Sequence, residues 1–198
     1  NGQGEYLGNI KLPGMLAVAF VRSPIAHGRI VSIEKPAGLE HAVFTMDDLK
    51  GVSPIRAVTR LAGFKPSDQW PLAKDKVRQV GEMIAMCVAP TRAEAEDIAQ
   101  QVFVDFEELP AVVDMLTART APPALVHEEW GDNLFLTTLA DDDLSNIKRT
   151  AAVTVTRQLR TARQSMAPME GRGVVCEWNR RLSQLVMYSA AQMPHINR

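Results

Sequence analysis

The stretch that decides the fold is Val77–Asp114, VRQVGEMIAMCVAPTRAEAEDIAQQVFVDFEELPAVVD. Within it, residues 84–89 (IAMCVA) form a short apolar run between a Gly-Glu pair and Pro90. A short run of this kind, bounded by turn signals, is typical of a strand that is buried on both faces. We therefore expect a buried strand at 84–89.

A helix and a second strand are predicted directly after this run. Thr91 and Glu94 have the spacing of a capping box, in which the two side chains satisfy each other's backbone N–H groups. Small and apolar residues then recur at helical spacing up to Val102, with acidic residues and glutamines opposite. Residues 102–106 are strand-like, and Pro110 follows. The pattern predicts a strand–helix–strand unit whose helix has about 12 residues, a typical length.

Other strands are predicted on both sides of this unit. Residues 16–21 (LAVAFV) predict a buried strand, and residues 22–30 a turn that leads into a strand at 31–33. Residues 147–160 alternate β-branched apolar and polar side chains, which indicates a half-buried strand. Residues 173–178 and 182–190 flank Asn-Arg-Arg and predict a hairpin. Together these elements predict an α+β fold.

Composition excludes several classes of partner. The chain has 198 residues, of which 46% are hydrophobic and 23% charged, with a formal net charge of −1. These values indicate a globular protein and give no sign of binding to nucleic acid or to a membrane surface. No apolar run approaches the roughly 18 residues of a membrane span.

The two cysteines, Cys87 and Cys176, form no C-x-x-C pair, so the chain has no thiolate set for zinc or an iron–sulfur cluster. We expect both to be small buried side chains in a reducing compartment. This predicts a cytoplasmic location. Because the chain opens with Asn1 and not with Met, a periplasmic location stays open.

Several polar residues could suggest chemistry, and in each case a structural role is the simpler interpretation. His27 has no His or Cys at ligand spacing. Asp47 and Asp48 follow Thr45 and are interpreted as the capped start of a short helix. His127-Glu128-Glu129 lacks the second histidine that a zinc protease needs.

Four blocks of sequence, in order, carry a resemblance to a known family. They are residues 12–30 (LPGMLAVAFVRSPIAHGRI), the stretch 77–114, residues 163–173 (RQSMAPMEGRG) and residues 189–195 (SAAQMPH). They resemble the large subunits of the molybdenum hydroxylases, the group of xanthine dehydrogenase, aldehyde oxidase and aerobic carbon monoxide dehydrogenase. Met83, Phe106 and Gly171 stand where the family pattern has Pro, Tyr and Pro.

The resemblance implies a division into domains. Residues 1–116 are expected to form the small α/β hammerhead domain with a mixed sheet, 117–135 a linker, and 136–198 the strand-rich, incomplete beginning of a molybdopterin-binding domain. Residues 117–123 (TARTAPP) have the composition of a linker. The chain is expected to be a portion of a longer polypeptide, since it lacks the family's G-G-F-G-G-K segment near the pterin and its base-supplying block.

The resemblance also implies an activity and its cofactors. Family members hydroxylate aldehydes or N-heterocycles with oxygen from water, or oxidise carbon monoxide, at a molybdopterin-type molybdenum cofactor. FAD and 2Fe-2S clusters are then expected on partner subunits or domains. One site residue carries over: Gln192, whose amide matches the family glutamine that donates a hydrogen bond to an oxo ligand of the metal. Glu82 belongs to another block and is not expected to be the base.

Two functions of different class follow. The first is the N-terminal part of the large subunit of a molybdenum-dependent oxidoreductase, inactive by itself and completed by the remainder of the large subunit and by iron–sulfur and FAD subunits. The second is a non-catalytic assembly subunit that docks onto a separately encoded molybdenum-binding chain, using an unfinished sheet edge in residues 150–198. A hydrolase is not supported, since no G-x-S-x-G elbow is present.

Overall fold

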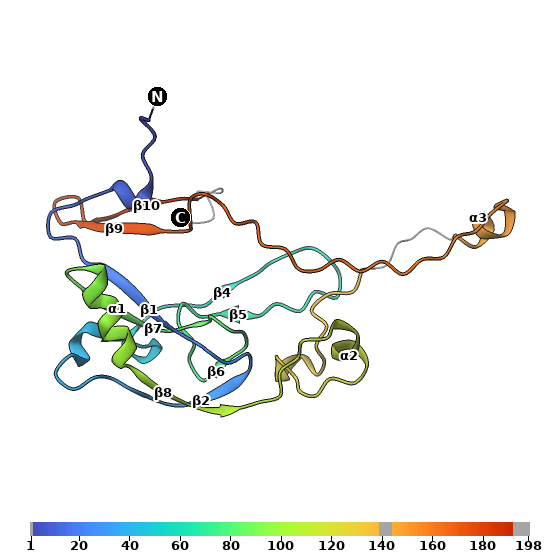
Figure 1. Cartoon of the computed structure of the whole chain (residues 1–198), viewed down its shortest axis with the longest axis horizontal. Coiled ribbons are helices and arrows are strands. Elements are labelled where there is room, and N and C mark those ends of the chain that lie inside the picture. Colours follow the sequence, from blue (N-terminus) through green and yellow to red (C-terminus); the bar gives the residue numbers. More distant parts are fainter. Residues whose placement is uncertain (1, 139–143, 192–198) are drawn as a thin grey trace. The chain divides into compact units, whose positions relative to one another are not determined.

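The computed structural model describes residues 2–138 and 144–191, which fall into two compact units. One unit, here the continuous unit, is Gly14–Asp141. The other, here the split unit, combines Asn1–Pro13 with Asp142–Arg198. Both are strand-rich with small sheets and few helices, as expected for an α+β fold (Figure 1).

The first sheet of the continuous unit contains the predicted buried strand at its centre. The strand order is β1 (Ala17–Arg22), β7 (Met83–Ala89), β3 (Val43–Phe44), and β7 is antiparallel to both neighbours. Ile84, Ala85 and Cys87 of β7 are fully buried. The apolar run of β7 is therefore explained by cover on both faces, and that prediction is confirmed.

Helix α1 (Arg92–Gln101) follows β7 and begins where the sequence predicts. Thr91 Oγ1 accepts a hydrogen bond from Glu94 N at 3.2 Å, and Glu94 Oε2 accepts one from Thr91 N at 3.0 Å. Ala95 and Ile98 form the buried face of α1 and pack into the core cluster of the first sheet. The capping box is thus confirmed.

The second sheet receives the chain after α1. Its order is β6 (Lys76–Val77), β2 (Gly28–Glu34), β8 (Phe103–Glu108). The predicted strand–helix–strand unit therefore connects two different sheets, since β7 belongs to the first and β8 to the second. Ile33 and Val104 pack against the core clusters of both sheets and join them into one core.

Strand β1 differs from the expectation of a buried strand. Its side chains alternate between half-buried and exposed, with Val18, Phe20 and Arg22 on the exposed face. The reason is its position: β1 is an edge strand, and only the face toward α1 and the core is covered.

The remaining elements of the continuous unit are short. Residues 51–76 are mostly loop, with one small hairpin that an ion pair of Arg56 with Asp68 closes. The further short elements are η2 (Glu40–Ala42), η3 (Met46–Asp48), β4 (Ile55–Arg56), β5 (Asp68–Gln69), α2 (Met115–Thr120) and η4 (Glu128–Trp130). No helix within 2–138 or 144–191 has the length and apolar character needed to cross a bilayer.

The split unit is built around the predicted hairpin. Strands β9 (Val174–Asn179) and β10 (Gln184–Ser189) pair antiparallel in continuous register, which confirms that prediction. The N-terminal turn η1 (Leu7–Asn9) belongs to this unit, since Leu7 N donates to Glu170 Oε1 at 3.1 Å.

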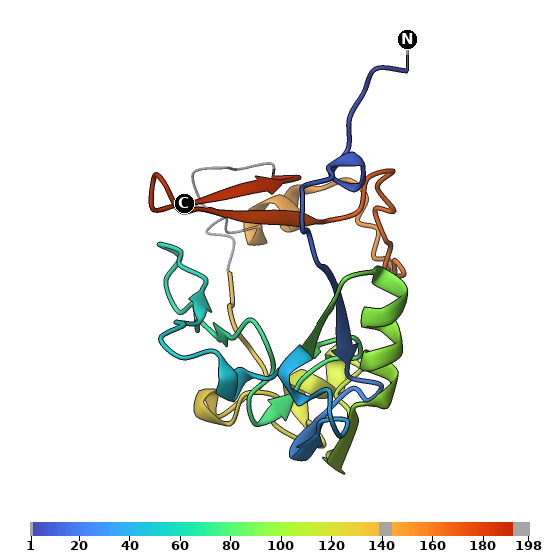
Figure 2. The ribbon, with the colours of Figure 1, turned by 90° about the vertical axis from the view of Figure 1, so that its left-hand side faces the viewer.

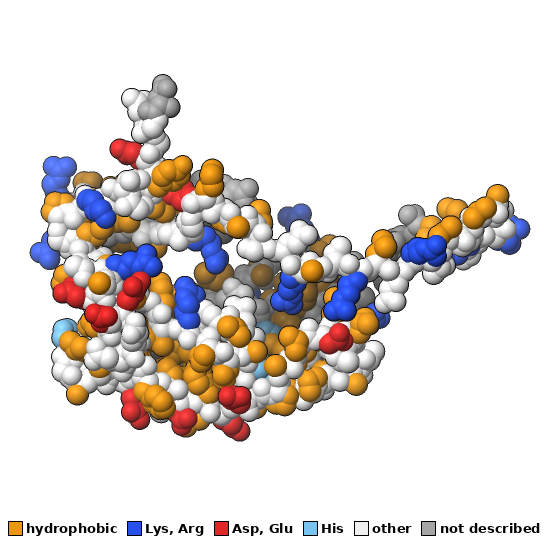
Figure 3. Space-filling model, viewed as in Figure 1, with side chains coloured by type: hydrophobic (Ala, Val, Ile, Leu, Met, Phe, Trp, Pro, Cys, Tyr) orange, Lys and Arg blue, Asp and Glu red, His pale blue; other side chains and the backbone are white. Residues whose placement is uncertain are grey.

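The predicted strand at residues 147–160 is wrong for the described chain. Helix α3 (Ser145–Thr150) covers its beginning, and residues 151–168 form neither helix nor strand and are exposed. A half-buried strand needs a neighbouring strand and a core, and no described strand pairs with this segment. Figure 3 shows exposed apolar and basic side chains along α3 and the part of the chain that follows it.

The two cysteines also differ from each other. Cys87 is buried as expected, and burial raises the pKa of its thiol. Cys176 of β9 is exposed, which corrects the expectation that both are buried. The two-stranded sheet of the split unit has no described layer to cover this position.

Candidate functional site

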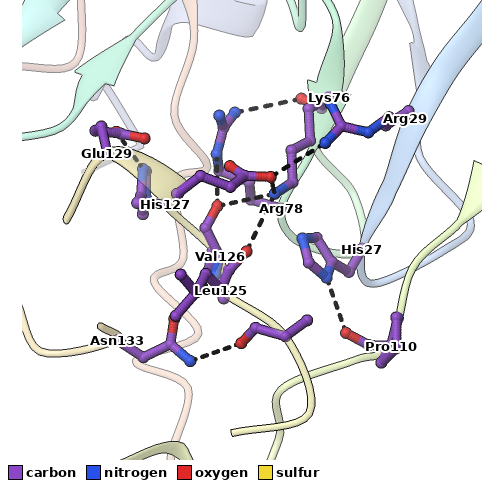
Figure 4. A network of polar contacts seen from close by, with 12 residues as sticks. His27, Arg29, Lys76, Arg78, Pro110, Leu125, Val126, His127, Glu129 and Asn133 are labelled. Atoms are coloured by element: carbon purple, nitrogen blue, oxygen red, sulfur yellow. Dashed lines mark hydrogen bonds and ion pairs between the residues drawn. The ribbon is translucent and has the colours of Figure 1, made fainter. Parts of the chain in front are cut away.

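A network of polar contacts holds residues 124–135 against the second sheet of the continuous unit, β6-β2-β8 (Figure 4). We call its four cationic side chains, Arg29, Lys65, Lys76 and Arg78, the basic clamp. The clamped segment is part of the stretch expected to be a linker. It lies in the continuous unit because its backbone carbonyls and acidic side chains accept from the clamp.

Lys76 is the centre of the clamp. It lies on the short edge strand β6, whose two residues are both buried, and its side chain is only 2% exposed. Its ammonium donates to Leu125 O and Val126 O, both at 3.2 Å, and to Glu128 Oε1 at 2.8 Å. These acceptors match the three donors of a lysine, which is the condition for burying its charge.

Glu128 connects Lys76 to a second strand. Arg29 of β2 donates to the same Oε1 atom at 3.3 Å. The hydrogen bond from Lys76 lowers the pKa of Glu128 from its usual 4.5 to about 2, and the charge of Arg29 acts in the same direction. Glu128 is therefore an anion fixed between two cations, and it is not free to act as an acid or a base near neutral pH.

Arg78 fixes both the clamped segment and the Gly-Glu turn before β7. Its Nε donates to Val126 O at 3.2 Å, and its backbone N donates to Glu82 Oε2 at 2.6 Å. Gly81 occupies the left-handed region at a φ of 84°, and its N–H donates to Ser23 O at 2.8 Å. Glu82 thus has a structural partner in the backbone of Arg78.

The clamped segment is also closed on itself. Asn133 accepts from Val126 N at 2.9 Å and donates to Ala124 O at 2.9 Å. Lys65 fixes the C-terminal part of the segment: its ammonium donates to Asp132 Oδ1 at 2.6 Å and to Trp130 O at 3.2 Å. These contacts give residues 124–135 a fixed shape, and we call this segment the strap.

His27 lies buried beside this network (Figure 4). Its Nδ1 is 2.8 Å from Pro110 O, so this nitrogen carries the donated proton. Its Nε2 is buried without a described hydrogen-bond partner. His27 joins the start of β2 to the chain after β8, which agrees with the structural interpretation of this residue.

The other candidate residues make local contacts. His127 stacks on Trp130 with ring centroids 4.2 Å apart, and burial lowers the pKa of its imidazole. Within the described ranges no group of three or more His, Cys, Asp or Glu side chains could hold a metal ion. Asp48 caps η3 as interpreted: its Oδ2 accepts from Thr45 N and from Lys35 Nζ, both at 2.7 Å.

Gln192 lies outside the described residues. The structure describes the strand that leads toward it: β10 ends at Ser189, which pairs with Val174 of β9. The basic clamp was not predicted, because its contacts join residues about 50 positions apart, such as Lys76 with Glu128. Residues 72–77 (LAKDKV) contain three charged side chains, and nothing local marks Lys76 as the buried one.

Comparisons with known proteins identify the class. Residues 1–110 match the aldehyde oxidase and xanthine dehydrogenase a/b hammerhead domain, and residues 126–198 match the molybdopterin cofactor-binding domain. The chain belongs to the aldehyde oxidase and xanthine dehydrogenase family, the molybdenum hydroxylases, and the resemblance seen in the sequence is confirmed.

Individual relatives include two large subunits and one solved structure. The chain is 32% identical to the carbon monoxide dehydrogenase large chain of Hydrogenophaga pseudoflava, over 100% of this chain and 26% of that protein. It is 33% identical to the nicotine 6-hydroxylase large subunit of Paenarthrobacter nicotinovorans, over 98% of this chain and 24% of that protein. The structure of quinoline 2-oxidoreductase from Pseudomonas putida 86 superimposes with a TM-score of 0.88 and 37% identity, over 98% of this chain and 25% of that one. The chain thus spans about a quarter of the length of these relatives.

Proposed function

We propose that this chain forms the N-terminal part of the large subunit of a molybdenum-dependent oxidoreductase that hydroxylates aldehydes or N-heterocycles or oxidises carbon monoxide. The observation that carries the proposal is the presence of both family domains on one chain, in the family's order, at residues 1–110 and 126–198. In this assignment residues 1–116 are the hammerhead module, 117–135 the connection and 136–198 the start of the cofactor-binding module. In this assignment the basic clamp anchors residues 124–135 on the hammerhead module.

The described residues do not by themselves fit a bound molybdenum cofactor. In the ranges 2–138 and 144–191 no set of metal-ligating side chains converges, and the hairpin β9–β10 is open to solvent over most of its residues. We therefore derive no reaction step from this chain alone. Its proposed contribution is scaffold and position, with the cofactor held mainly by other segments of the large subunit.

Gln192 is the one residue proposed to face the cofactor. An amide N–H group can donate to a metal-bound oxo group without being a ligand. In a complete large subunit, Gln192→Ala is expected to leave the molybdenum content unchanged and to lower kcat by about 10²-fold, the usual effect of removing one such donor. Equal loss of metal and activity would instead assign Gln192 to cofactor retention.

The proposed partners are the remainder of the large subunit, an iron–sulfur subunit or domain, an FAD subunit or domain, and a small-molecule substrate. The relatives named as large chains and subunits support an assembly of several polypeptides. Both cysteines, the buried Cys87 and the exposed Cys176, are free thiols, which supports a reducing, cytoplasmic setting.

Metal analysis tests the proposal. The 198-residue chain is expected to contain no molybdenum and to show no hydroxylase activity, whereas the complete large subunit expressed with its partners contains stoichiometric molybdenum. Stoichiometric molybdenum in the 198-residue chain would refute the proposal that other segments of the large subunit hold the cofactor. Absence of molybdenum from the complete assembly would refute the enzyme assignment. Molybdenum held by a second, separately encoded polypeptide that co-purifies with the 198-residue chain would favour the assembly-subunit alternative.

A further inference from the structure

The outer edge of β1 offers unpaired backbone to solvent. In the described part of the chain, the strand pairs with β7 alone, through the register Ala17↔Ala89 to Arg22↔Met83. In an antiparallel edge strand, the backbone groups of alternate residues point away from the sheet and need another partner. For β1 no described residue supplies one.

The other long edge strand of the same unit is protected, whereas β1 is not. Strand β8 carries Asp105, Glu107 and Glu108 in exposed positions, and such charges discourage the pairing of a further strand. Residues 17–21 of β1 contain neither charge nor proline. The exposed apolar side chains of Leu16, Val18 and Phe20 recur at every second position along it. One edge is therefore protected against strand addition and the other is open to it.

A groove runs along this open edge. It has a volume of about 520 Å³ and is lined by Val18–Arg22 of β1 and by Arg92, Glu96, Ala99 and Gln100 of α1. Five consecutive strand residues point alternately to the two faces, so a groove that touches all five follows the edge itself. Figures 1 and 2 both show α1 lying beside β1. A strand edge flanked by a helix is the geometry in which proteins accept an added peptide strand.

The charged side chains of the groove indicate which kind of peptide would bind there. Arg92 is neutralised by Glu96, with Nε and Oε1 2.7 Å apart. Arg22 lies over the Phe20 ring at 5.6 Å and donates to Gly81 O at 2.8 Å, but no described carboxylate pairs with it. The end of the groove near Arg22 therefore has a positive charge that is not compensated.

We propose that β1 is the docking edge for an extended segment of a partner polypeptide, which adds to the sheet as a strand. The segment would place apolar side chains on Val18 and Phe20 and a carboxylate on Arg22. A second copy of this chain fits less well, since residues 14–22 contain no acidic side chain that could reach Arg22 when two β1 strands pair. The inference rests on the proposed function only in taking the partner to be another subunit of the enzyme.

The test compares amide hydrogen exchange of residues 17–22 in the assembled enzyme and in the large subunit separated from its partners. Assembly is expected to slow exchange of alternate amides in this strand at least tenfold. Phe20→Lys and Arg22→Glu are each expected to raise the dissociation constant for the partner subunit at least tenfold. Phe103→Lys, on the protected edge strand β8 and also exposed, is the matched control and should leave that constant unchanged. If Phe20→Lys fails to fold, Arg22→Glu carries the test.

Three results would overturn the proposal. Residues 17–22 could exchange equally fast in both states, or they could already be protected in the separated large subunit, in which case its own chain covers the edge. The separated subunit could also form a dimer that Arg22→Glu dissociates. The molybdenum content of the same preparations reports on the enzyme assignment independently, so failure of the docking edge and failure of the proposed function are distinguishable.

Discussion

The ammonium of Lys76 and the carboxylate of Glu128 meet at 2.8 Å across 52 positions of sequence, with the lysine side chain 2% exposed and the glutamate side chain 49% exposed. The pair joins the edge strand β6 to the strap at 124–135. Its asymmetry is informative: the lysine cannot reach water, so it depends on its three acceptors, whereas the glutamate keeps contact with solvent. Loss of the acceptors should therefore destabilise the protein more through Lys76 than through Glu128.

Lys76→Met should release the strap. The substitution keeps an unbranched side chain that is one atom shorter but removes all the donors, which leaves Leu125 O without its partner and Glu128 with Arg29 as its one remaining described side-chain partner. We expect a loss of about 2 kcal/mol in the free energy of unfolding, measured with urea. We also expect faster amide exchange at 124–128. Lys74→Met, at an exposed lysine two positions away, is the control; equal effects of both variants would contradict the role of the clamp.

Acid should weaken the same contact. The pKa of Glu128 is held at about 2 in the folded protein, below its usual 4.5, so its stabilising effect is complete above pH 4.5 and is lost as the pH falls toward 2. Glu128→Gln should therefore lower stability at pH 7 and flatten the decline of stability between pH 4.5 and 2. Asp97→Asn, an exposed carboxylate without an ion pair to a described residue, should leave the slope unchanged. An unaltered slope in Glu128→Gln would refute the assignment.

The cap of α1 can be tested separately. Thr91→Ala removes the hydroxyl that accepts from Glu94 N but retains the bond from residue 91 N to the Glu94 carboxylate. We expect a loss of about 1 kcal/mol in the free energy of unfolding. Thr154→Ala, at an exposed position of residues 151–168, should change nothing measurable. A neutral Thr91→Ala would mean that packing on the sheet alone fixes the helix start.

Gly28 marks a close approach of β2 and β8. A Cβ atom there would lie 3.1 Å from Glu107 O and would collide with the end of the Ile25 side chain. Gly28→Ala should therefore cost about 1–2 kcal/mol through forced displacement of packed atoms. Gly171→Ala, which meets open space, is the control. A lower thermal midpoint for Gly28→Ala only would support the close contact.

The sequence predicted well those elements whose signals are local. The strand β7, the capping box at Thr91 and the hairpin β9–β10 each depend on residues within a few positions of one another. The exposed face of β1 could not be predicted, because an apolar run does not reveal whether a second layer covers it. The assignment of β7 and β8 to different sheets is likewise a tertiary property.

The candidate site was harder to predict for the same reason. The acidic pair at Glu128-Glu129 drew attention to the right segment, but its partner Lys76 lies in another part of the sequence. The strand predicted at residues 147–160 shows the reverse problem. Its alternating pattern favours an extended strand, but a strand is stable only beside a neighbouring strand. No described strand pairs with residues 147–160.

The contact of Leu7 N with Glu170 spans 163 positions, and the entire continuous unit lies between its two ends. During synthesis the first turn therefore emerges long before its acceptor exists. At about 5–20 residues per second, the ribosome needs roughly 10–30 s to deliver the second half of this contact. In that interval residues 14–138 can complete their own core, while Leu7 N still lacks its acceptor. Maturation of the split unit is thus timed by translation of an inserted domain.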